Sequence, residues 1–279
     1  MLAPIVLMDT LLHDAAKRAF SDLARRWLAS DSARDGLLAA VEQLGFADAL
    51  PAPDDLEAWP SAAAIIRAQA RSAAPIDMAL LLATGDRAGS ISRAGVYDCA
   101  SGAAVPDSAA ALAALSLGRC LQIAEALQAC LDMSLQYVQD RRQFGQPLAK
   151  FQVIQHGLAV AAEEVAACGA ISDLALACAV REGVLTARMS ALLDAAAVVA
   201  ARSVDVVYDI CHQVHGAIGF TQEYPLHRHS IHLLHWRDHL QLLRGGELIC
   251  AERLGEVALE QGSVWGAVTA LMNPNPGNE

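Results

Sequence analysis

The chain has 279 residues, of which 54% are hydrophobic and only 5% aromatic, and its net charge of −11 corresponds to a pI near 5.2. Much of the hydrophobic fraction is alanine and leucine. These are strong helix formers, so the composition favours packed helices over sheets. The acidic balance argues against a nucleic-acid-binding surface.

Three features of the sequence indicate the compartment of the protein and whether it crosses a membrane. Seven cysteines are scattered without a Cys-x-x-Cys pair, which is typical of reduced thiols. The apolar start Leu2–Met8 lacks the basic region and cleavage site of a secretory signal. The alanine-rich run at 189–201 contains Asp194, which indicates a buried helix instead of a membrane span. We therefore expect a cytoplasmic protein whose partners include neither membrane nor nucleic acid.

Residues 1–84 are predicted to form an N-terminal helical domain. Apolar residues recur at helical spacing over about 9–29, and shorter helices are expected at 35–44, 59–71 and 75–83. Glycines and serines then mark turns, so residues 85–107 are predicted to be a linker. The linker has room for one or two short strands, at Ser90–Arg93 and Gly95–Tyr97.

Residues 108–262 are predicted to form a helical bundle. A helix is expected to run from about Asp107 to Arg141, with leucines such as Leu117, Leu121 and Leu127 on one face. Three long helices then complete an antiparallel four-helix bundle, and a shorter one follows. Their predicted ranges are 150–181, 185–213, 222–243 and 246–261. Residues 263–279 are predicted to be a tail with a disordered end, so the fold class is mainly α.

A helix breaker, Phe144-Gly145-Gln146-Pro147, follows the first long helix. On physical grounds alone it indicates a turn between two helices. However, the sequence Arg-Arg-Gln-Phe-Gly-Gln-Pro-Leu at residues 141–148, followed by Phe151-Gln152, resembles the flavin-contacting turn of the acyl-CoA dehydrogenase family.

A second stretch, residues 213–225, agrees with this resemblance. It is similar to the family's Gln-x-x-Gly-Gly-x-Gly-(Phe/Tyr)-x-x-Glu-x-Pro motif, with Ala217 in place of the second glycine. The resemblance covers roughly residues 115–255 and implies the family's C-terminal helical bundle. In the family a middle β-domain of roughly a hundred residues carries the flavin ring, and here about 24 residues stand in its place. The resemblance therefore implies a fold whose middle β-domain is largely missing.

The resemblance also implies a set of residues that bind FAD held mainly by a neighbouring subunit. Arg141 would reach the diphosphate or the adenine end, Phe144 would pack on the adenine, and the glycine loop would cradle the ribose and diphosphate. The alternatives are a cation at a helix C-terminus for Arg141, core packing for Phe144, and a tight turn between helices for the loop. The implied cofactor-binding residues are Arg141, Gln143, Phe144, Gln152, Gln213, Gly216, Ala217 and Gly219.

Five histidines between His227 and His239 could suggest a metal site, and His235 and His239 are spaced to share a helix face. A metal site needs three or four converging ligands, and no His-Glu-x-x-His or cysteine pair accompanies them. We therefore expect no metal, and we expect these histidines at the surface or at an interface.

Enzymes of this family remove the α-proton of the substrate with a side-chain carboxylate, which often belongs to a Glu that directly precedes a Gly in the sequence. If Gly246 is that glycine, Gly245 stands at the position of the base. The alternative family position, near Leu115–Ser116, has no acid either. If the motif is aligned in another register, Asp238 or Glu247 stands at the position of the base. No catalytic residue is predicted beyond these two alternatives.

These features predict a subunit of a heteromeric FAD-dependent acyl-CoA dehydrogenase. It would pair as α2β2 with a full-length homologue that binds most of the acyl-CoA, and it would complete that partner's FAD site. The resemblance implies bulky acyl-CoA substrates, including steroid side-chain thioesters. Two alternatives remain: an active dehydrogenase with a displaced base, and a helical scaffold without flavin.

Overall fold

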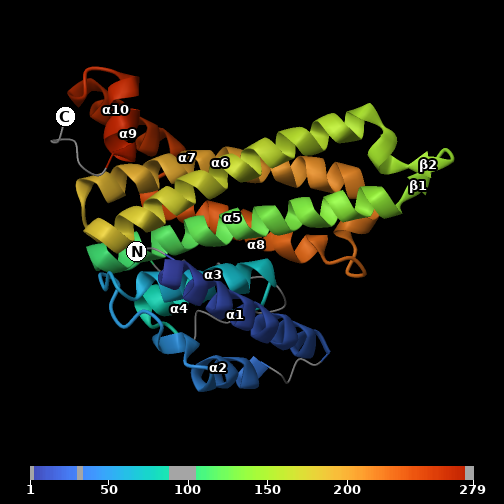
Figure 1. Cartoon of the computed structure of the whole chain (residues 1–279), viewed down its shortest axis with the longest axis horizontal. Coiled ribbons are helices and arrows are strands. Elements are labelled where there is room, and N and C mark those ends of the chain that lie inside the picture. Colours follow the sequence, from blue (N-terminus) through green and yellow to red (C-terminus); the bar gives the residue numbers. More distant parts are fainter. Residues whose placement is uncertain (1–2, 30–33, 88–104, 274–279) are drawn as a thin grey trace.

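The structure is a computed structural model that describes residues 3–29, 34–87 and 105–273. Within these ranges it is built almost entirely from ten α-helices (Figure 1). Four of them precede the linker: α1 (Ala3–Ala29), α2 (Arg34–Gln43), α3 (Trp59–Arg71) and α4 (Met78–Thr84). The other six are α5 (Ala109–Asp140), α6 (Gln152–Glu182), α7 (Ala187–His215), α8 (Leu226–Arg244), α9 (Glu247–Glu260) and α10 (Val264–Met272).

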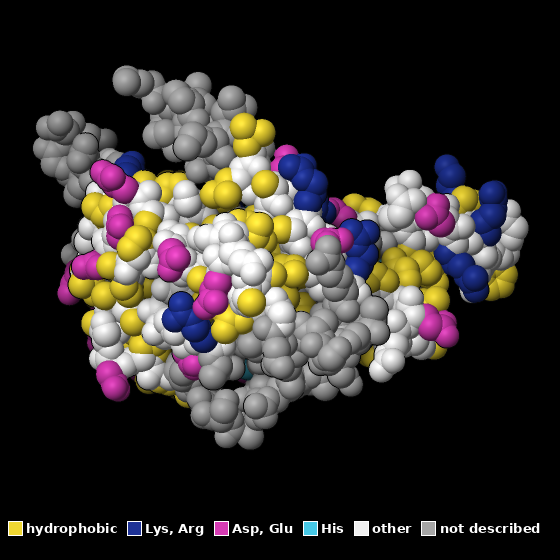
Figure 2. All heavy atoms as spheres, turned by 90° about the horizontal axis from the view of Figure 1, so that it is seen from below, with side chains coloured by type: hydrophobic (Ala, Val, Ile, Leu, Met, Phe, Trp, Pro, Cys, Tyr) yellow, Lys and Arg dark blue, Asp and Glu magenta, His cyan; other side chains and the backbone are white. Residues whose placement is uncertain are grey.

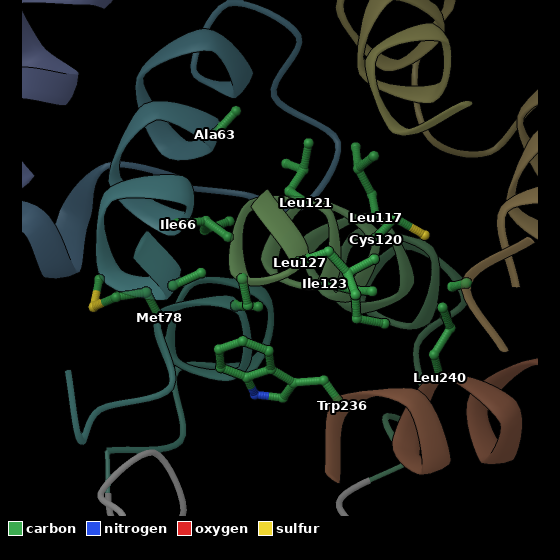
Figure 3. Packing of buried hydrophobic residues seen from close by; sticks show 14 of the residues in the cluster. Ala63, Ile66, Met78, Leu117, Cys120, Leu121, Ile123, Leu127, Trp236 and Leu240 are labelled. Atoms are coloured by element: carbon green, nitrogen blue, oxygen red, sulfur yellow. The ribbon is translucent and has the colours of Figure 1, made fainter. Parts of the chain in front are cut away.

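The long helices α5, α6, α7 and α8 lie side by side as a bundle, and the N-terminal helices pack against one side of it (Figure 1). Helix α5 contacts all three other bundle helices and also α3 and α4, so it is the central element. Leu117, Leu121 and Leu127 on α5 are fully buried, as the leucine spacing predicts. Figure 3 shows this part of the core, with Trp236 and Leu240 of α8 on one side and Ile66 and Met78 of the N-terminal helices on another.

Side chains fix where several helices begin. The Ser108 hydroxyl accepts a hydrogen bond from the amide of Ala111 at the start of α5, and Thr186 does the same for Met189 at the start of α7. Such caps satisfy amides that have no partner within the helix. Gly118 lets α4 approach α5 closely, because a Cβ at that position would lie 2.6 Å from the Cβ of Ala79.

A buried polar network ties the N-terminal helices to the bundle. The guanidinium of Arg119 on α5 forms an ion pair with Asp77 (2.6 Å) and donates hydrogen bonds to Gln122 (2.6 Å) and to Nδ1 of His239 on α8 (3.0 Å). Gln122 donates in turn to the side chain of Gln69 on α3 (2.8 Å). Burial alone would raise the pKa of Asp77, but the charge of Arg119 and its hydrogen bonds lower that pKa to about 2. The network therefore fixes α3, α4, α5 and α8 relative to one another.

The predicted mainly α fold and bundle are confirmed, and the structure differs from the sequence prediction in three places. The corner after α5 contains a two-stranded hairpin, and part of the predicted tail forms α10, whose amide at Gly266 is capped by Ser263. The expectation that the histidines of α8 lie at the surface is wrong for His229, His232 and His239, which are 6%, 3% and 5% exposed. The predicted strands at 90–97 and the end of the tail lie outside the described residues.

Helix α5 is long and apolar enough to cross a membrane, judged by length and composition. However, 83% of its most apolar window is buried inside the protein, as expected for the core helix of a bundle.

Candidate functional site

The corner after α5 is a β-hairpin that projects beyond the end of the bundle (Figure 1). Strands β1 (Arg142–Gln143) and β2 (Gln146–Pro147) pair with Gln143 opposite Gln146. The two residues of the turn, Phe144 and Gly145, have φ of 51° and 82°. Positive φ at both positions is the geometry of a type I′ turn, and it suits glycine but strains phenylalanine.

The hairpin presents its side chains to solvent. Phe144 is 91% exposed, which excludes core packing as its role, and among the described residues its ring contacts only Phe151, edge-on with centroids 6.2 Å apart. Arg141, Arg142 and Gln143 are also exposed. Within the described residues, no hydrogen bond or ion pair holds the guanidinium of Arg141 or Arg142. Figure 2 shows Lys and Arg side chains gathered at this projecting end of an otherwise acidic protein.

The backbone of Arg141 is firmly held although its side chain is not. Its amide donates to the carbonyl of Tyr137 (2.8 Å), and its own carbonyl accepts from the amide of Leu148 (2.9 Å). Arg141 therefore acts as the C-cap of α5, as one reading of the sequence predicts, and its guanidinium remains available to a ligand. The two roles are compatible.

The second motif forms the turn between α7 and α8. Gly216 has φ +64° and ψ −145°, a conformation that suits glycine, and a short 3₁₀ helix, η5 (Gly216–Phe220), follows it. A Cβ on Gly219 would lie 3.0 Å from Cβ of His215 and 3.3 Å from Nδ1 of His212. Gly219 therefore lets the turn fold closely onto α7. Gln213 and Ala217 are exposed.

A hollow of about 690 Å³ lies between the start of α6, the end of α7 and η5. Gln213 and Gly216 line it, as do Val153 and Ile154, the residues just after Gln152. The hollow thus brings the second motif next to the start of α6. Its walls are mostly apolar, and its other lining residues are Gly157, Tyr208, Asp209, Ile210, His212, Val214 and Phe220.

His212 is a buried polar residue of the hollow that the sequence motifs do not reveal. It is 5% exposed, and neither ring nitrogen has a hydrogen-bond partner within the described part of the chain. Its ring stacks on Phe220 (centroids 4.2 Å apart) and lies near Tyr208 (4.4 Å). Burial, and next the neighbouring His215, lower its pKa below the usual 6.5. A neutral imidazole with free nitrogens can donate or accept a hydrogen bond from a bound group.

The structure places both alternative bases on the surface. Asp238 is exposed and paired with Arg237 (2.8 Å), and Glu247 is an exposed first residue of α9. Neither lines a hollow described here. Gly245 has φ +85° as the C-cap of α8, and Arg244 is bound to the buried Asp194 (2.6 Å). Leu115 and Ser116 are fully buried in α5.

The described residues contain no group of three or more His, Cys, Asp or Glu side chains able to hold a metal ion. Of the histidines of α8, His229, His232 and His239 are buried inside the fold and His227 and His235 are half-buried. Burial lowers the pKa of His229 to about 4, of His232 to about 3 and of His235 to about 4. They are therefore neutral at physiological pH.

Comparisons with known proteins give the class of the helical bundle. The family described as acyl-CoA dehydrogenase, C-terminal domain, matches residues 108–235. The chain is 37% identical over 103 residues to glutaryl-CoA dehydrogenase of Desulfococcus multivorans, covering 36% of this chain and 25% of that protein. It is 31% identical over 102 residues to the acyl-CoA dehydrogenase IpdE2 of Mycobacterium tuberculosis, covering 37% of this chain and 29% of that protein. Residues 108–235, which make up most of the bundle, are therefore similar to the C-terminal domain of acyl-CoA dehydrogenases.

The chain spans only about a quarter of the length of the curated relatives it matches. One solved structure matches the fold over almost its whole length. This is a chain from a variant of the Tcur3481–Tcur3483 steroid ACAD, with a TM-score of 0.69 and 19% identity. The match covers 92% of this chain and 99% of that chain. The N-terminal helices and the bundle are therefore shared with that protein as one fold.

Proposed function

We propose that this chain is a subunit of a heteromeric acyl-CoA dehydrogenase and completes the FAD site of a full-length partner. The observation that carries the proposal is the guanidinium of Arg141, which no described residue binds, on a hairpin that projects from a bundle similar to the C-terminal domain of this family. A guanidinium without a protein partner is suited to a diphosphate, which it can bind through two parallel hydrogen bonds.

The residues present fit the adenosine diphosphate half of FAD. Arg141 would contact the diphosphate, and the exposed ring of Phe144 would pack on the adenine. Gly216 would let the backbone approach the ribose, and Gln213 and Gln152 would add amide hydrogen bonds from either side of the hollow. His212 would offer its unpartnered ring nitrogens to the bound group. Gln143, Ala217 and Gly219 would shape the two turns and make no charged contact.

FAD, when bound, supplies the acceptor for the hydride that leaves the substrate's β-carbon. This chain has only 24 residues, 85–108, between α4 and α5, where the family it resembles has the domain that carries the flavin ring. The ring and the catalytic carboxylate are therefore assigned to the partner. Residues 1–84, 85–107, 108–262 and 263–279 are proposed as N-terminal domain, linker, bundle and tail.

The proposed substrate is a bulky acyl-CoA, with steroid side-chain thioesters as the leading class. Its support is the name of the whole-chain structural match, which is called a steroid ACAD and joins two gene products. An α2β2 assembly in the cytoplasm, with the acyl-CoA held mainly by the partner, completes the proposal.

Co-expression with a full-length acyl-CoA dehydrogenase encoded next to this chain tests the proposal. We expect the two chains to co-purify with bound flavin, visible by absorption, and the single chain to be colourless and prone to self-association. A stable yellow homodimer with one FAD per chain would favour an active dehydrogenase that uses Asp238 or Glu247. A complex without flavin would favour the scaffold.

A further inference from the structure

The two motifs of the site are far apart in sequence, and three aromatic rings join them. His215, the last residue of α7, is 5% exposed, and its ring packs against the rings of both Tyr137 and Tyr224. Its ring centroid is 4.4 Å from that of Tyr137, in a stacked arrangement, and 4.7 Å from that of Tyr224. The two tyrosines also touch each other edge-on at 5.8 Å. The end of α5, the end of α7 and the turn before α8 thus meet at one imidazole.

Each ring of this group is connected to one part of the site. The backbone carbonyl of Tyr137 accepts the amide hydrogen bond of Arg141, so the residue that carries this ring is also the last anchor of α5 before the hairpin. His215 precedes Gly216 directly, and its Cβ contacts the position where Gly219 folds back. Tyr224 donates from its hydroxyl to the carbonyl of Met133 on α5 (3.4 Å). A shift of His215 would therefore move the glycine turn and the hairpin relative to each other.

The orientation of the imidazole is itself fixed. Its Nδ1 lies 2.8 Å from the carbonyl oxygen of Cys211, and since a carbonyl can only accept, Nδ1 carries the proton and donates. Burial lowers its pKa below 6.5, so the ring is neutral at physiological pH. A neutral ring between two tyrosines packs without an uncompensated charge.

We infer that His215 is a positioning residue, which holds the Arg141 hairpin and the Gly216–Phe220 turn in the relative geometry that binds one FAD. The inference rests on the proposed function for its ligand, but the coupling of the two turns is a property of this chain alone. His215 makes no contact with FAD in this arrangement and acts through the segments that do.

Two substitutions of His215 separate its ring contacts from its Nδ1 hydrogen bond. His215→Ala removes both, while His215→Phe keeps a ring against the two tyrosines and loses only the Nδ1 hydrogen bond. The matched control is Val204→Ala, which also truncates a fully buried residue of α7 but lies away from both turns. Arg141→Ala serves as the variant that removes a direct FAD contact.

The first measurement is amide hydrogen exchange in the full chain without flavin. Three amides report on the two turns: those of Arg141 and Leu148 in the hairpin, and that of Thr221 after η5. Loss of both ring contacts should raise their exchange in His215→Ala by about ten-fold over Val204→Ala, and His215→Phe should restore most of the protection. Equal exchange in His215→Ala and Val204→Ala would overturn the inference.

The second measurement is FAD affinity of the complex with its partner. We expect His215→Ala to weaken it roughly ten-fold, His215→Phe to bring it back near the unmodified value, and Val204→Ala to leave it unchanged. If Arg141→Ala weakens FAD binding and His215→Ala does not, the positioning role is wrong and the proposed function stands. If Arg141→Ala also has no effect, the proposed function itself fails.

Discussion

Arg119 and Arg141 both belong to the central helix, one in its middle and one at its C-cap, yet their surroundings differ completely. Arg119 is fully buried, and Asp77, Gln122 and His239 take up its hydrogen bonds. Arg141 is exposed, and within the described chain nothing holds its guanidinium. The first arrangement is what a protein needs to bury a charge, and the second leaves a cation free for a ligand.

This difference separates the part of the molecule that maintains the fold from the part that we assign to function. A buried charge must be matched inside the protein, because water cannot solvate it there. An exposed guanidinium is solvated by water, so it needs no partner within the protein and has little effect on the free energy of unfolding. The predictions below test this separation: substitutions in the buried region should change stability, and substitutions at the hairpin should change FAD binding.

The largest effect is expected from Arg119→Met. It leaves Asp77 as a buried charge without its partner and should lower the free energy of unfolding by about 3–5 kcal/mol. Denaturant unfolding of the chain measures this loss. The control is Arg67→Ala, whose ion pair with Asp173 is solvent-exposed and should cost less than about 1 kcal/mol. A loss no larger than that of the control would contradict the proposed role of the network.

The buried histidines of α8 should make stability depend on pH. His229, His232 and His235 have folded pKa values of about 4, 3 and 4, below the unfolded value of 6.5. Each therefore contributes stability that is complete above pH 6.5 and is lost as pH falls from 6.5 to its folded pKa, about 4 for His229 and His235 and about 3 for His232. The stability lost by pH 5 should be on the order of a few kcal/mol.

Thermal unfolding at a series of pH values measures this dependence. His232→Gln removes one titrating group and should flatten the profile between pH 6.5 and 4. His156→Gln is the control, because His156 is exposed on α6. An equal slope in both variants would show that the buried histidines are not responsible.

At the hairpin the expected change is in binding. Arg141→Ala should weaken FAD retention by the complex by about 1.5–3 kcal/mol, roughly ten- to a hundred-fold, because a charge-assisted contact is lost. Gln213→Ala should also weaken it, by less. Both variants should remain as helical as the unmodified chain and nearly as stable, because the side chains of Arg141 and Gln213 are exposed. Titration with FAD at limiting flavin measures the affinity, and Arg25→Ala, an exposed arginine on α1, is the control.

The sequence predicts the long helices well because alanine and leucine recur at helical spacing over many turns, as at Leu117, Leu121 and Leu127. It does not predict the type I′ hairpin, because Phe144 occupies a backbone conformation that phenylalanine rarely adopts. The motifs name Arg141 and Gln213 but not His212 or His215, whose importance comes from rings that pack from other elements. The sequence places the histidines of α8 at the surface or at an interface, because composition alone does not show that the Arg119 network and its surroundings bury one side of α8.

The smallest effect is expected where the sequence offers a displaced base. Asp238 and Glu247 are both exposed, and Asp238 already pairs with Arg237. Neither carboxylate is among the residues that line the hollow beside η5, and a general base must lie within hydrogen-bond reach of the proton that it removes. Asp238→Asn and Glu247→Gln should therefore leave turnover within a few-fold. Gly245→Glu should not create a second active site, because φ +85° at Gly245 is strained for glutamate and the proposed function assigns the flavin ring to the partner. The measurement is dye reduction by the reconstituted complex with an acyl-CoA, compared with a variant that lacks the partner's catalytic Glu. A catalytic base contributes typically ~10²–10⁴-fold, so the outcomes are well separated. If either variant abolishes activity as fully as the partner's variant does, this chain is itself a catalyst and its assignment as a supporting subunit is wrong.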